Sequence, residues 1–569
     1  MPSVIIVGGG MAGCGAALRL AEAGYAVTFL EGRGELLLGS SGATPCRVGL
    51  GFHYPDKSTA IRALKNAVRF VRAYKNVGIQ LRVGEDKPLD HPLRRGHYYI
   101  TKDSQFSVEH VLSLYDGLKE AYADLIKENP ENEVFGPAEN FYKVLWKESD
   151  ETAKEQQDAL SDLVSHDKVA CALETAEHSL NWSAFQSYFI DKIMHHPNIR
   201  VLLNTEVKEI TPDRQQHCYV VKTKAGEETA DFVINSSWYN IEALNKTAGV
   251  KVDPENRTLR VKVIIKIKLP EALLDKPSAF FCFGPHCSLT NTGDGYGWLS
   301  YEPVTNIGAS NKLNLDPELK ALVEGHVTDA QKEEFGRKII AGASQYIPEL
   351  SQAEYKATKI GVVRTLGKKA PINDPNSAIH NRDYLGVQAE LLGLISNPAT
   401  KLLAWMSNAE VVEKLCNAFD QAYTLIRTVE ADLARDEDIF RQMITSRLEE
   451  GLLPKYDEQT QEIDSEIISY EQENKRGTDR KEIAKTIKSV IQQKKELAKE
   501  LTRHHGFFSA ESSFNDFTSD TDSIADSITD ESMSFIDEAH LENEIGRKSH
   551  EPLEGHATAS SSRISSKSR

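Results

Sequence analysis

The start of the chain alternates between short apolar runs and a helical pattern. Residues 4–7 form a β-branched run that ends in glycines, which is typical of a buried parallel strand. Apolar positions at helical spacing follow from 12 to 23, and Gly24 ends that pattern. A second apolar run at 26–30 ends at Glu31. The pattern therefore predicts a strand–helix–strand unit at the beginning of the chain.

Similar patterns continue through the middle of the chain. They predict a helix with one apolar face at 57–74 and strands near 97–101, 200–203, 217–223 and 231–235. Strands that return so late to pair with the first unit imply a domain whose sequence is interrupted by another domain.

Residues 259–268 alternate strongly between apolar and basic positions. Val263 and Ile265 point to one face, whereas Lys262, Lys266 and Lys268 point to the other. We interpret this segment as a half-exposed antiparallel strand, with the same sheet continuing through 280–301.

The composition changes after residue 402. One apolar stripe with 3,4 spacing runs from Val412 to Leu433, and a second runs from Ile483 to Leu501. Two interpretations are open: a helical hairpin that packs on the same chain, or a coiled-coil surface at 411–505 for a protein partner. From 506 onward Ser, Thr, Asp and Glu dominate, so disorder is expected there.

The composition argues against nucleic acid as a general partner and against disulfides and a metal site. With 84 acidic and 67 basic residues the formal net charge is -17, which argues against general binding to nucleic acid. Seven cysteines without a repeating spacing favour reduced thiols in a cytosol-type compartment. The adjacent pairs His195–His196 and His504–His505 point apart on any regular element, so no metal site is expected.

No apolar run is long enough to span a bilayer, and the N-terminus lacks the basic region of a secretory signal. We therefore expect a cytoplasmic protein. The alternative is export by a bacterial secretion system without a cleaved signal.

Gly8, Gly10 and Gly13 spell G-x-G-x-x-G between the first strand and the first helix. The first glycine allows the tight turn, the second lets the backbone approach a pyrophosphate, and the third lets helix and strand pack closely. The helix N-terminus then faces the phosphates with free N–H groups. Glu31, at the end of the second strand, is placed to accept the ribose hydroxyls. A dinucleotide site is therefore predicted.

NAD sites share this motif, so the motif alone leaves the dinucleotide open. Two features favour FAD: the motif lies at the extreme N-terminus, and the loop 39–42 follows Glu31 closely. The hydroxyl of Ser41 and the backbone of that loop are then in reach of the pyrophosphate.

Several stretches resemble FAD-dependent oxidoreductases of the D-amino-acid oxidase type, which include glycine oxidase, sarcosine oxidase and 2-hydroxyglutarate oxidase-like proteins. They are VIIVGGGMAGCGAALRLAEAGYAVTFLE, SSGATPCRVGLGFHYPDKSTA, LNTEVKEI, ADFVINSSWYN and the regions around GVVRTLGKK and GLISNPATKLLAWMSNA. The resemblance implies that Val207 lies against the adenine through its backbone and that Ser236 passes near the cofactor. It also implies that the segment ending at Lys401 closes over the flavin. That segment departs from the family pattern, in which glycines precede the lysine.

The resemblance further implies a cation that binds the substrate's carboxylate. Bidentate binding by a guanidinium would fix the acid with its Cα–H toward flavin N5. Arg47, in the loop after the cofactor strand, is the first candidate, followed by Arg364; Arg94 and Arg95 are further candidates. His53 and Tyr54 lie in the same loop as Arg47 and are expected to orient substrate or flavin.

The expected fold is α/β, with a discontinuous glutathione-reductase-like FAD-binding Rossmann domain and an antiparallel-sheet substrate domain. The expected boundaries are 1–85, 168–250 and 355–410 for the FAD-binding domain, 86–167 and 251–354 for the substrate domain, 411–505 for the helical extension and 506–569 for the acidic tail.

The expected function is FAD-dependent oxidation of a small amine, amino acid or 2-hydroxy acid by hydride transfer to flavin N5. The alternative is a catalytically weakened flavin-fold protein that acts by binding, in one version a bacterial secreted effector. The altered segment before Lys401, the helical extension and the acidic tail motivate this alternative.

Overall fold

The computed structural model describes residues 2–88, 91–149, 163–213, 216–254, 257–284, 286–367, 386–399 and 401–435. All of them belong to one compact unit, Met1–Glu473. The second apolar stripe and the acidic tail expected from the sequence lie outside the described residues.

A six-stranded sheet contains both strands of the N-terminal strand–helix–strand unit. All its strands run parallel except the edge strand β17. Its order β17-β18-β10-β1-β2-β6 brings together segments far apart in the sequence. The strands are β17 (Gln388–Leu391), β18 (Leu394–Ser396), β10 (Phe232–Asn235), β1 (Ser3–Val7), β2 (Ala26–Leu30) and β6 (Ile199–Leu202).

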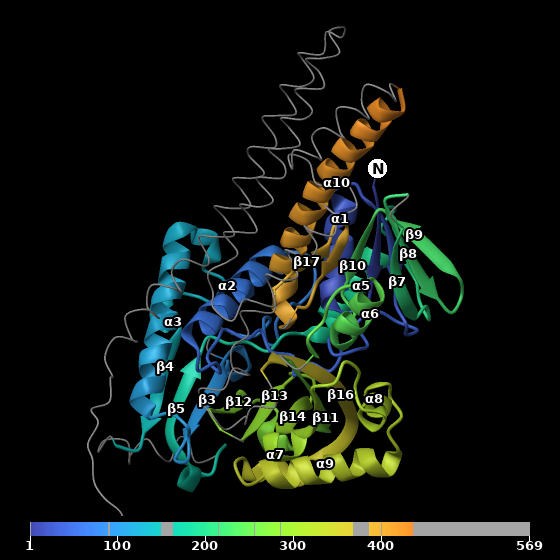
Figure 1. Ribbon diagram of the computed structural model, residues 1–569. Coiled ribbons are helices and arrows are strands. Elements are labelled where there is room, and N and C mark those ends of the chain that lie inside the picture. The colour runs from blue at the N-terminus through green and yellow to red at the C-terminus, as the bar shows by residue number, and fades with distance from the viewer. Residues whose placement is uncertain are drawn as a thin grey trace, which may run out of the picture. The chain divides into compact units, whose positions relative to one another are not determined.

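A second, nine-stranded sheet is antiparallel apart from the pairing of β12 with β3. Figure 1 shows it in the lower part of the molecule. Its strands in order are β15 (Asn306–Ser310), β11 (Arg257–Lys268), β14 (Tyr296–Tyr301), β13 (Cys287–Asn291), β12 (Ser278–Cys282), β3 (Gly96–Thr101), β5 (Val169–Thr175) and β4 (Tyr142–Lys147), and β16 (Glu354–Leu366) pairs with β11.

Helices and a small third sheet cover these two sheets (Figure 1). The third sheet comprises β7 (Val207–Asp213), β8 (Cys218–Thr223) and β9 (Glu227–Ala230). The helices are α1 (Met11–Glu22), α2 (Lys57–Tyr74), α3 (Val108–Glu128), α5 (Trp182–Met194), α6 (Ile241–Thr247), α7 (Glu302–Thr305), α8 (Pro317–Val323), α9 (Asp329–Ala343) and α10 (Trp405–Arg435).

The two faces of the second sheet contribute to different cores. Side chains such as Ile265 and Phe281 pack on α9 through Ile339. On the opposite face, Phe280 and Trp298 join the largest core, which also contains α1, α2 and α3. This inner face of the second sheet is therefore turned toward the segments that surround the first sheet.

The inner face adds detail to the half-exposed strand expected at 259–268. The lysines of 259–268 do alternate with apolar residues, but Lys262 and Lys266 are half-buried and only Lys268 is exposed. Ile264, between them, is buried in the largest core. Alternation identified the two faces of this half-exposed antiparallel strand, but it could not show how much of the lysine face other segments cover.

Sheet membership differs from the expected domain boundaries at two strands. Both β5 and β16 pair within the second sheet, although 168–250 and 355–410 were expected in the FAD-binding domain. The chain thus crosses between the sheets after β5 and after β16.

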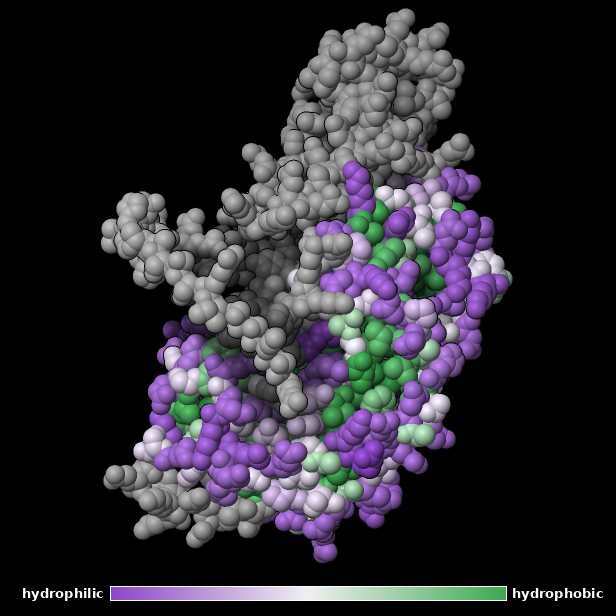
Figure 2. Space-filling view, turned by 60° about the horizontal axis from the view of Figure 1, so that its bottom comes forward, coloured by the Kyte–Doolittle hydropathy of each residue, from purple (hydrophilic) through white to green (hydrophobic). Residues whose placement is uncertain are grey.

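Hydrophilic side chains predominate on the face shown in Figure 2, with apolar side chains gathered in a patch between them. In the described part of the chain, no helix has the length and apolarity that crossing a membrane requires.

The first part of the long C-terminal helix packs on the chain itself. Val412, Cys416 and Phe419 of α10 are buried in the core that contains α1. Tyr25 donates from its hydroxyl to Asn417 Oδ1 at 2.6 Å. The beginning of the apolar stripe therefore docks inward, whereas the side chains beyond Tyr423 lie outside the described ones.

Gly15→Ala should destabilise the protein, because a Cβ on Gly15 would clash with the ring of Trp405, which packs on α1 at the start of α10. Overpacking of this kind costs about 1–3 kcal/mol of the free energy of unfolding. Urea unfolding would measure it, with Gly39→Ala as control because a Cβ there meets nothing within 4 Å. Equal stability of the two variants would contradict this packing.

Candidate functional site

A cavity of about 910 Å³ opens where the parallel strands of the first sheet end. Its lining includes Gly8 after β1, Glu31 after β2, Ser236 after β10 and Asn397 after β18. Strand β1 lies between β2, the next strand in the sequence, and β10, a strand from much later in the chain. The strand order therefore reverses beside β1, and the cavity lies at this topological switch point. Open α/β sheets bind ligands at such points.

The glycines of the motif shape one wall of this cavity. Gly8 has φ 103°, and a Cβ on it would lie 2.7 Å from Ser236 O. A Cβ on Gly13 would clash with the carbonyl oxygen of Gly8, so α1 packs closely on the end of β1. Gly10 lines the cavity, and the nearest atom to a Cβ there would be Ser41 Oγ at 3.3 Å. The close packing expected at Gly8 and Gly13 is therefore present, and Gly10 lies where a ligand in the cavity could approach the backbone.

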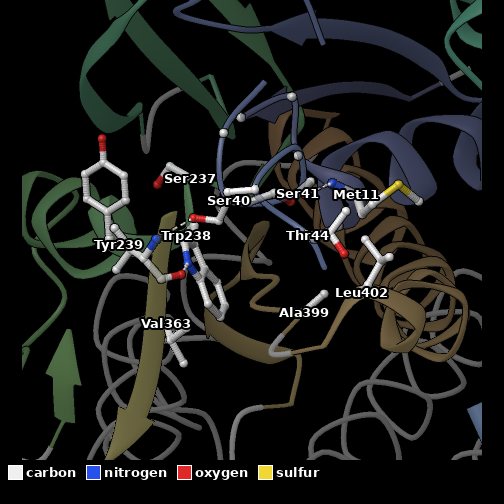
Figure 3. A pocket seen from close by; sticks show the side chains of 18 of the residues that line it. Met11, Ser40, Ser41, Thr44, Ser237, Trp238, Tyr239, Val363, Ala399 and Leu402 are labelled. Atoms are coloured by element: carbon white, nitrogen blue, oxygen red, sulfur yellow. Dashed lines mark hydrogen bonds between the residues drawn. The ribbon is translucent and has the colours of Figure 1, made fainter. Parts of the chain in front are cut away.

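The N-terminus of α1 faces the loop that contains Ser41. Gly10 is its N-cap residue and provides no side-chain hydrogen bond. The first helical N–H, that of Met11, donates to Ser41 Oγ at 3.0 Å. Figure 3 shows Ser40, Ser41 and Thr44 beside this helix end. N–H groups and hydroxyls at a helix N-terminus form a binding site for phosphate.

Glu31 is held rigidly at the end of β2. Its Oε2 accepts from the Gly9 N–H at 2.5 Å, and its Oε1 accepts from the Arg33 N–H at 2.7 Å. Val207, at the start of β7, lines the same end of the cavity. This end therefore has the carboxylate and the backbone edge expected for the adenosine half of a dinucleotide.

Four of the predicted residues come together at the other end of the cavity. Arg47 Nη2 lies 3.4 Å from His53 Nδ1, and the ring centres of His53 and Tyr54 are 3.9 Å apart. The ammonium of Lys401 lies 4.7 Å from the centre of the Tyr54 ring. All four line the cavity. We call this group the polar cluster.

Glu177 largely balances the charge of Arg47. Arg47 Nε donates to Glu177 Oε1 at 2.8 Å, and Glu177 is buried. The guanidinium also donates to the Tyr98 hydroxyl and stacks 3.7 Å from the centre of the Phe280 ring. Burial lowers the pKa of Arg47, but Glu177, together with Tyr98 and Cys282, opposes this effect and raises that pKa above its usual value. Arg47 is therefore a fixed, charged group.

Arg364, the second candidate for the carboxylate clamp, is not among the residues that line this cavity. It is buried on β16, and its guanidinium donates to Glu242 Oε1, which also accepts from Arg257 Nε at 3.0 Å. Burial raises the pKa of Glu242, but the two guanidiniums outweigh it and the pKa is lowered. Arg94 and Arg95 also lie outside the lining.

The segment that departs from the family pattern is anchored by Asn397. Its side-chain amide donates to Ala12 O at 3.0 Å and to Ser236 Oγ at 3.2 Å, and its Oδ1 accepts from Asn408 at 3.0 Å. One buried side chain thus connects β18 to α1, β10 and α10. Hydrogen bonds hold this segment beside the cavity without the usual glycines.

Sequence reasoning missed several lining residues. Trp238 has φ 60°, and its indole N–H donates to Val362 O at 2.7 Å, which connects the first sheet's loop to β16 (Figure 3). It lies two residues after Ser236, so the strand-end signal that found the serine also points to it. Lys320 and His326 reach the adenosine end from the region of α8. No sequence signal indicated them, because their position depends on how the second sheet packs.

The described residues contain no cluster of three or more His, Cys, Asp or Glu that could hold a metal ion.

A family model described as FAD dependent oxidoreductase matches residues 3–404. No match was found among curated proteins.

Three similar solved structures are oxidoreductases. Glycine oxidase from Geobacillus kaustophilus is 16% identical, with 74% of this chain and 95% of the oxidase covered and a TM-score of 0.49. L-Proline dehydrogenase from P. horikoshii is 15% identical, with 74% and 94% covered and a TM-score of 0.48. L-alpha-Glycerophosphate oxidase from Mycoplasma pneumoniae, with FAD bound, is 15% identical, with 73% and 95% covered and a TM-score of 0.47.

Gly10→Ala and Gly13→Ala should both weaken FAD binding, but only Gly13→Ala should also destabilise the fold. The methyl group at residue 13 meets backbone, so this variant should lose stability and dinucleotide binding together. The methyl group at residue 10 meets only a serine hydroxyl and points to the cavity, so this variant should stay folded. It should bind FAD at least about tenfold more weakly. Fluorescence titration with FAD and thermal unfolding of the apo forms would separate the two, and unchanged FAD affinity of Gly10→Ala would contradict the assignment.

His178 should make the stability of the fold depend on pH. It is buried beside the segment that pairs with Arg47, and burial, together with Arg82, Arg94 and Arg95, holds its pKa well below the usual value. Above about pH 6.5 this histidine is neutral in both the folded and the unfolded chain, so it does not oppose folding. As the pH falls below that value, the unfolded chain binds a proton that the buried side chain does not. The free energy of unfolding therefore falls by at most about 1.4 kcal/mol per pH unit.

The test compares His178→Gln with His195→Gln, an exposed histidine with 78% of its side chain accessible. Urea unfolding between about pH 7 and about pH 5 should show a shallower loss of stability for His178→Gln only. The same slope in wild type and His178→Gln would rule out a neutral buried histidine.

Proposed function

Because this chain belongs to the FAD-dependent oxidoreductase family, whose model matches residues 3–404, we propose that it oxidises a small amine, amino acid or 2-hydroxy acid. The bond oxidised is the C–N or C–O bond next to a carboxylate. One observation carries the proposal: the cavity joins a dinucleotide-binding end to a polar cluster that contains a fixed guanidinium. Membership of the family confirms the resemblance, the α/β fold class and FAD as the cofactor.

The residues that line the cavity fit FAD. The N-terminus of α1, with Gly8, Gly10 and Ser41, would hold the pyrophosphate, and Glu31 would hold the adenosine ribose. Val207 would lie by the adenine and Ser236 by the pyrophosphate, and Lys401 would lie at the flavin end. Bound FAD supplies the hydride-accepting chemistry of the reaction.

The residues at the flavin end orient an acid. Glu177 and Tyr98 fix one edge of the Arg47 guanidinium, so its remaining donors can bind a carboxylate with little loss of side-chain freedom. His53 and Tyr54 pack on each other and flank that position. The substrate's carboxylate is thereby held in one orientation relative to the flavin.

The alternative function, binding with weakened catalysis, draws on the segment before Lys401 and on the helices of 411–505. Asn397 anchors that segment beside the cavity, and α10 is described only to Arg435. No described contact favours the alternative over oxidation, and a protein partner for these helices stays a prediction.

Anaerobic addition of small 2-amino and 2-hydroxy acids to the purified holoenzyme tests the proposal. At least one acid should bleach the flavin absorbance, and its amide should not, because the amide lacks the charge that Arg47 binds. If none of the amines, amino acids or hydroxy acids reduces a fully loaded flavin, the proposed reaction is wrong.

Arg47→Lys should lower kcat/KM for the reactive acid by roughly tenfold to a hundredfold, since it keeps a charge beside Glu177 but removes the guanidinium fork. Arg95→Met is the matched control, because Arg95 lies outside the cavity lining. Steady-state kinetics at equal FAD content would measure both. Equal kcat/KM of Arg47→Lys and wild type would exclude Arg47 from substrate binding.

A further inference from the structure

Arg33 connects the end of the second strand to a helix that follows the second sheet in the chain. It lies two residues after Glu31, and its own N–H donates to the Glu31 carboxylate at 2.7 Å. Its guanidinium donates to Leu38 O at 3.0 Å and to Val323 O, the last carbonyl of α8, at 3.1 Å. One side chain thus links the end of β2, the loop after it and α8.

The end of α8 is shaped to receive this guanidinium. The N–H groups of Gly325 and His326 donate back to two carbonyls of the last helical turn, at 3.2 and 2.9 Å, and Gly325 has φ 95°. In such a glycine-terminated helix end, the turn itself satisfies two of the last carbonyls. The Val323 carbonyl accepts from Arg33, at the negative end of the helix dipole, where a cation is stabilised.

Side-chain packing also fixes α8 beside the loop that follows β10. Val323 is buried in a small core together with Val362 of β16, and Tyr239 packs against the same core. Figure 1 shows α8 beside β16, and Figure 3 shows Tyr239 on the side of the pocket opposite Ala399 and Leu402. Helix α8 therefore belongs to the wall at the adenosine end of the cavity.

The electrostatic surroundings of Tyr239 agree with this placement. Burial raises the pKa of its hydroxyl, Arg33 lowers it, and Glu324 and Glu31 raise it. Charges influence a buried hydroxyl in this way only when they lie near it. Tyr239, Arg33 and the end of α8 are thus gathered around Glu31.

Helix α8 and its terminal turn contribute three polar side chains to the cavity lining. They are those of Lys320, Glu324 and His326. Lys320 Nζ lies 3.5 Å from Glu324 Oε1. A hydrogen bond from Lys208 lowers the pKa of Glu206, directly before β7, and the charge of Lys320 lowers it further. The helix and the start of β7 are therefore close to each other at this end of the cavity.

The assignment of this end to the adenosine half of FAD is part of the proposed function. On that basis, we infer that residues 317–326, held by Arg33, enclose the adenosine half and slow the release of FAD. We call residues 317–326 together with Arg33 the adenosine clasp. Arg33 is its positioning residue, because it fixes Glu31 through its N–H and α8 through its guanidinium. FMN lacks the adenosine half, so the clasp selects FAD over FMN.

The rate of FAD release from the full-length holoenzyme tests the clasp without turnover. After dilution, flavin fluorescence should show that Arg33→Met releases FAD about tenfold faster than wild type, because two hydrogen bonds of a charged donor are lost. The affinity of the apoprotein for FMN should stay unchanged. Arg95→Met is the matched control, because the Arg95 guanidinium also donates to a backbone carbonyl, Asn140 O, but lies outside the cavity lining.

Gly325→Ala tests the helix turn while Arg33 stays in place. The added Cβ meets nothing within 4 Å, but φ 95° disfavours alanine, so the turn should shift and FAD should be released about fivefold faster. Gly24→Ala is the control, because α1 ends in the same kind of turn, with φ 94° and nothing within 4 Å, at its end away from the cavity. Thermal unfolding should show a similar loss for both variants, whereas only Gly325→Ala should release FAD faster.

Two results would overturn the clasp. One is a wild-type rate of FAD release in both Arg33→Met and Gly325→Ala. The other is an equal loss of FAD and FMN affinity in Arg33→Met, because the effect would then not come from the adenosine half.

These measurements also separate the inference from the proposed reaction. Faster FAD release from the two variants of a protein whose flavin no acid reduces would leave the clasp standing and reject the reaction. Reduction of the flavin by an acid, with FAD release that ignores both substitutions, would retain the reaction and reject the clasp.

Discussion

The close packing of the first turn of α1 on the end of β1 is the constraint on which the rest of the site depends. It requires a residue without a side chain at position 13, because any Cβ there would clash with the carbonyl of Gly8. Gly8, at φ 103°, directs the chain into the helix beside Ser236. Helix α1 therefore begins directly at the cavity, with the Met11 N–H toward Ser41 and the space in which we propose that the pyrophosphate of FAD binds.

The second sheet completes the site from the opposite side. Its outer face packs on α9, and its inner face shares a core with the helices around the first sheet. Val362 and Val363 of β16 bring this sheet to the cavity, which they line. Arg47, paired with Glu177 and stacked on Phe280 of this sheet, joins the inner face to the cavity that it lines.

Local signals in the sequence were enough to predict which residues meet around the glycine turn and line the cavity there. The glycine motif, the strand before it and Glu31 at the end of β2 are close in sequence, and their geometry follows from backbone rules that any βαβ unit obeys. The loop of Arg47, His53 and Tyr54 also reached the cavity, because it follows the cofactor strand directly.

The substrate end could not be predicted to the same extent, because it depends on contacts between distant segments. Alternation along β11 identified the face that carries its lysines, but it could not show that the neighbouring strand β16 meets the loop of Gly42, to which Lys359 donates. Arg364 has the same chemistry as Arg47, yet its strand carries it to Glu242 and away from the lining. Only the tertiary arrangement separates a cavity arginine from one in a buried ion pair.

The most direct test of the account is the visible absorption spectrum of the purified full-length protein, recorded before and after acid precipitation. We predict two flavin bands in the native protein and a yellow supernatant after precipitation, as expected for FAD held by the glycine turn, Ser41 and Glu31 without a covalent bond. A colourless protein that stays colourless after addition of FAD would contradict the account.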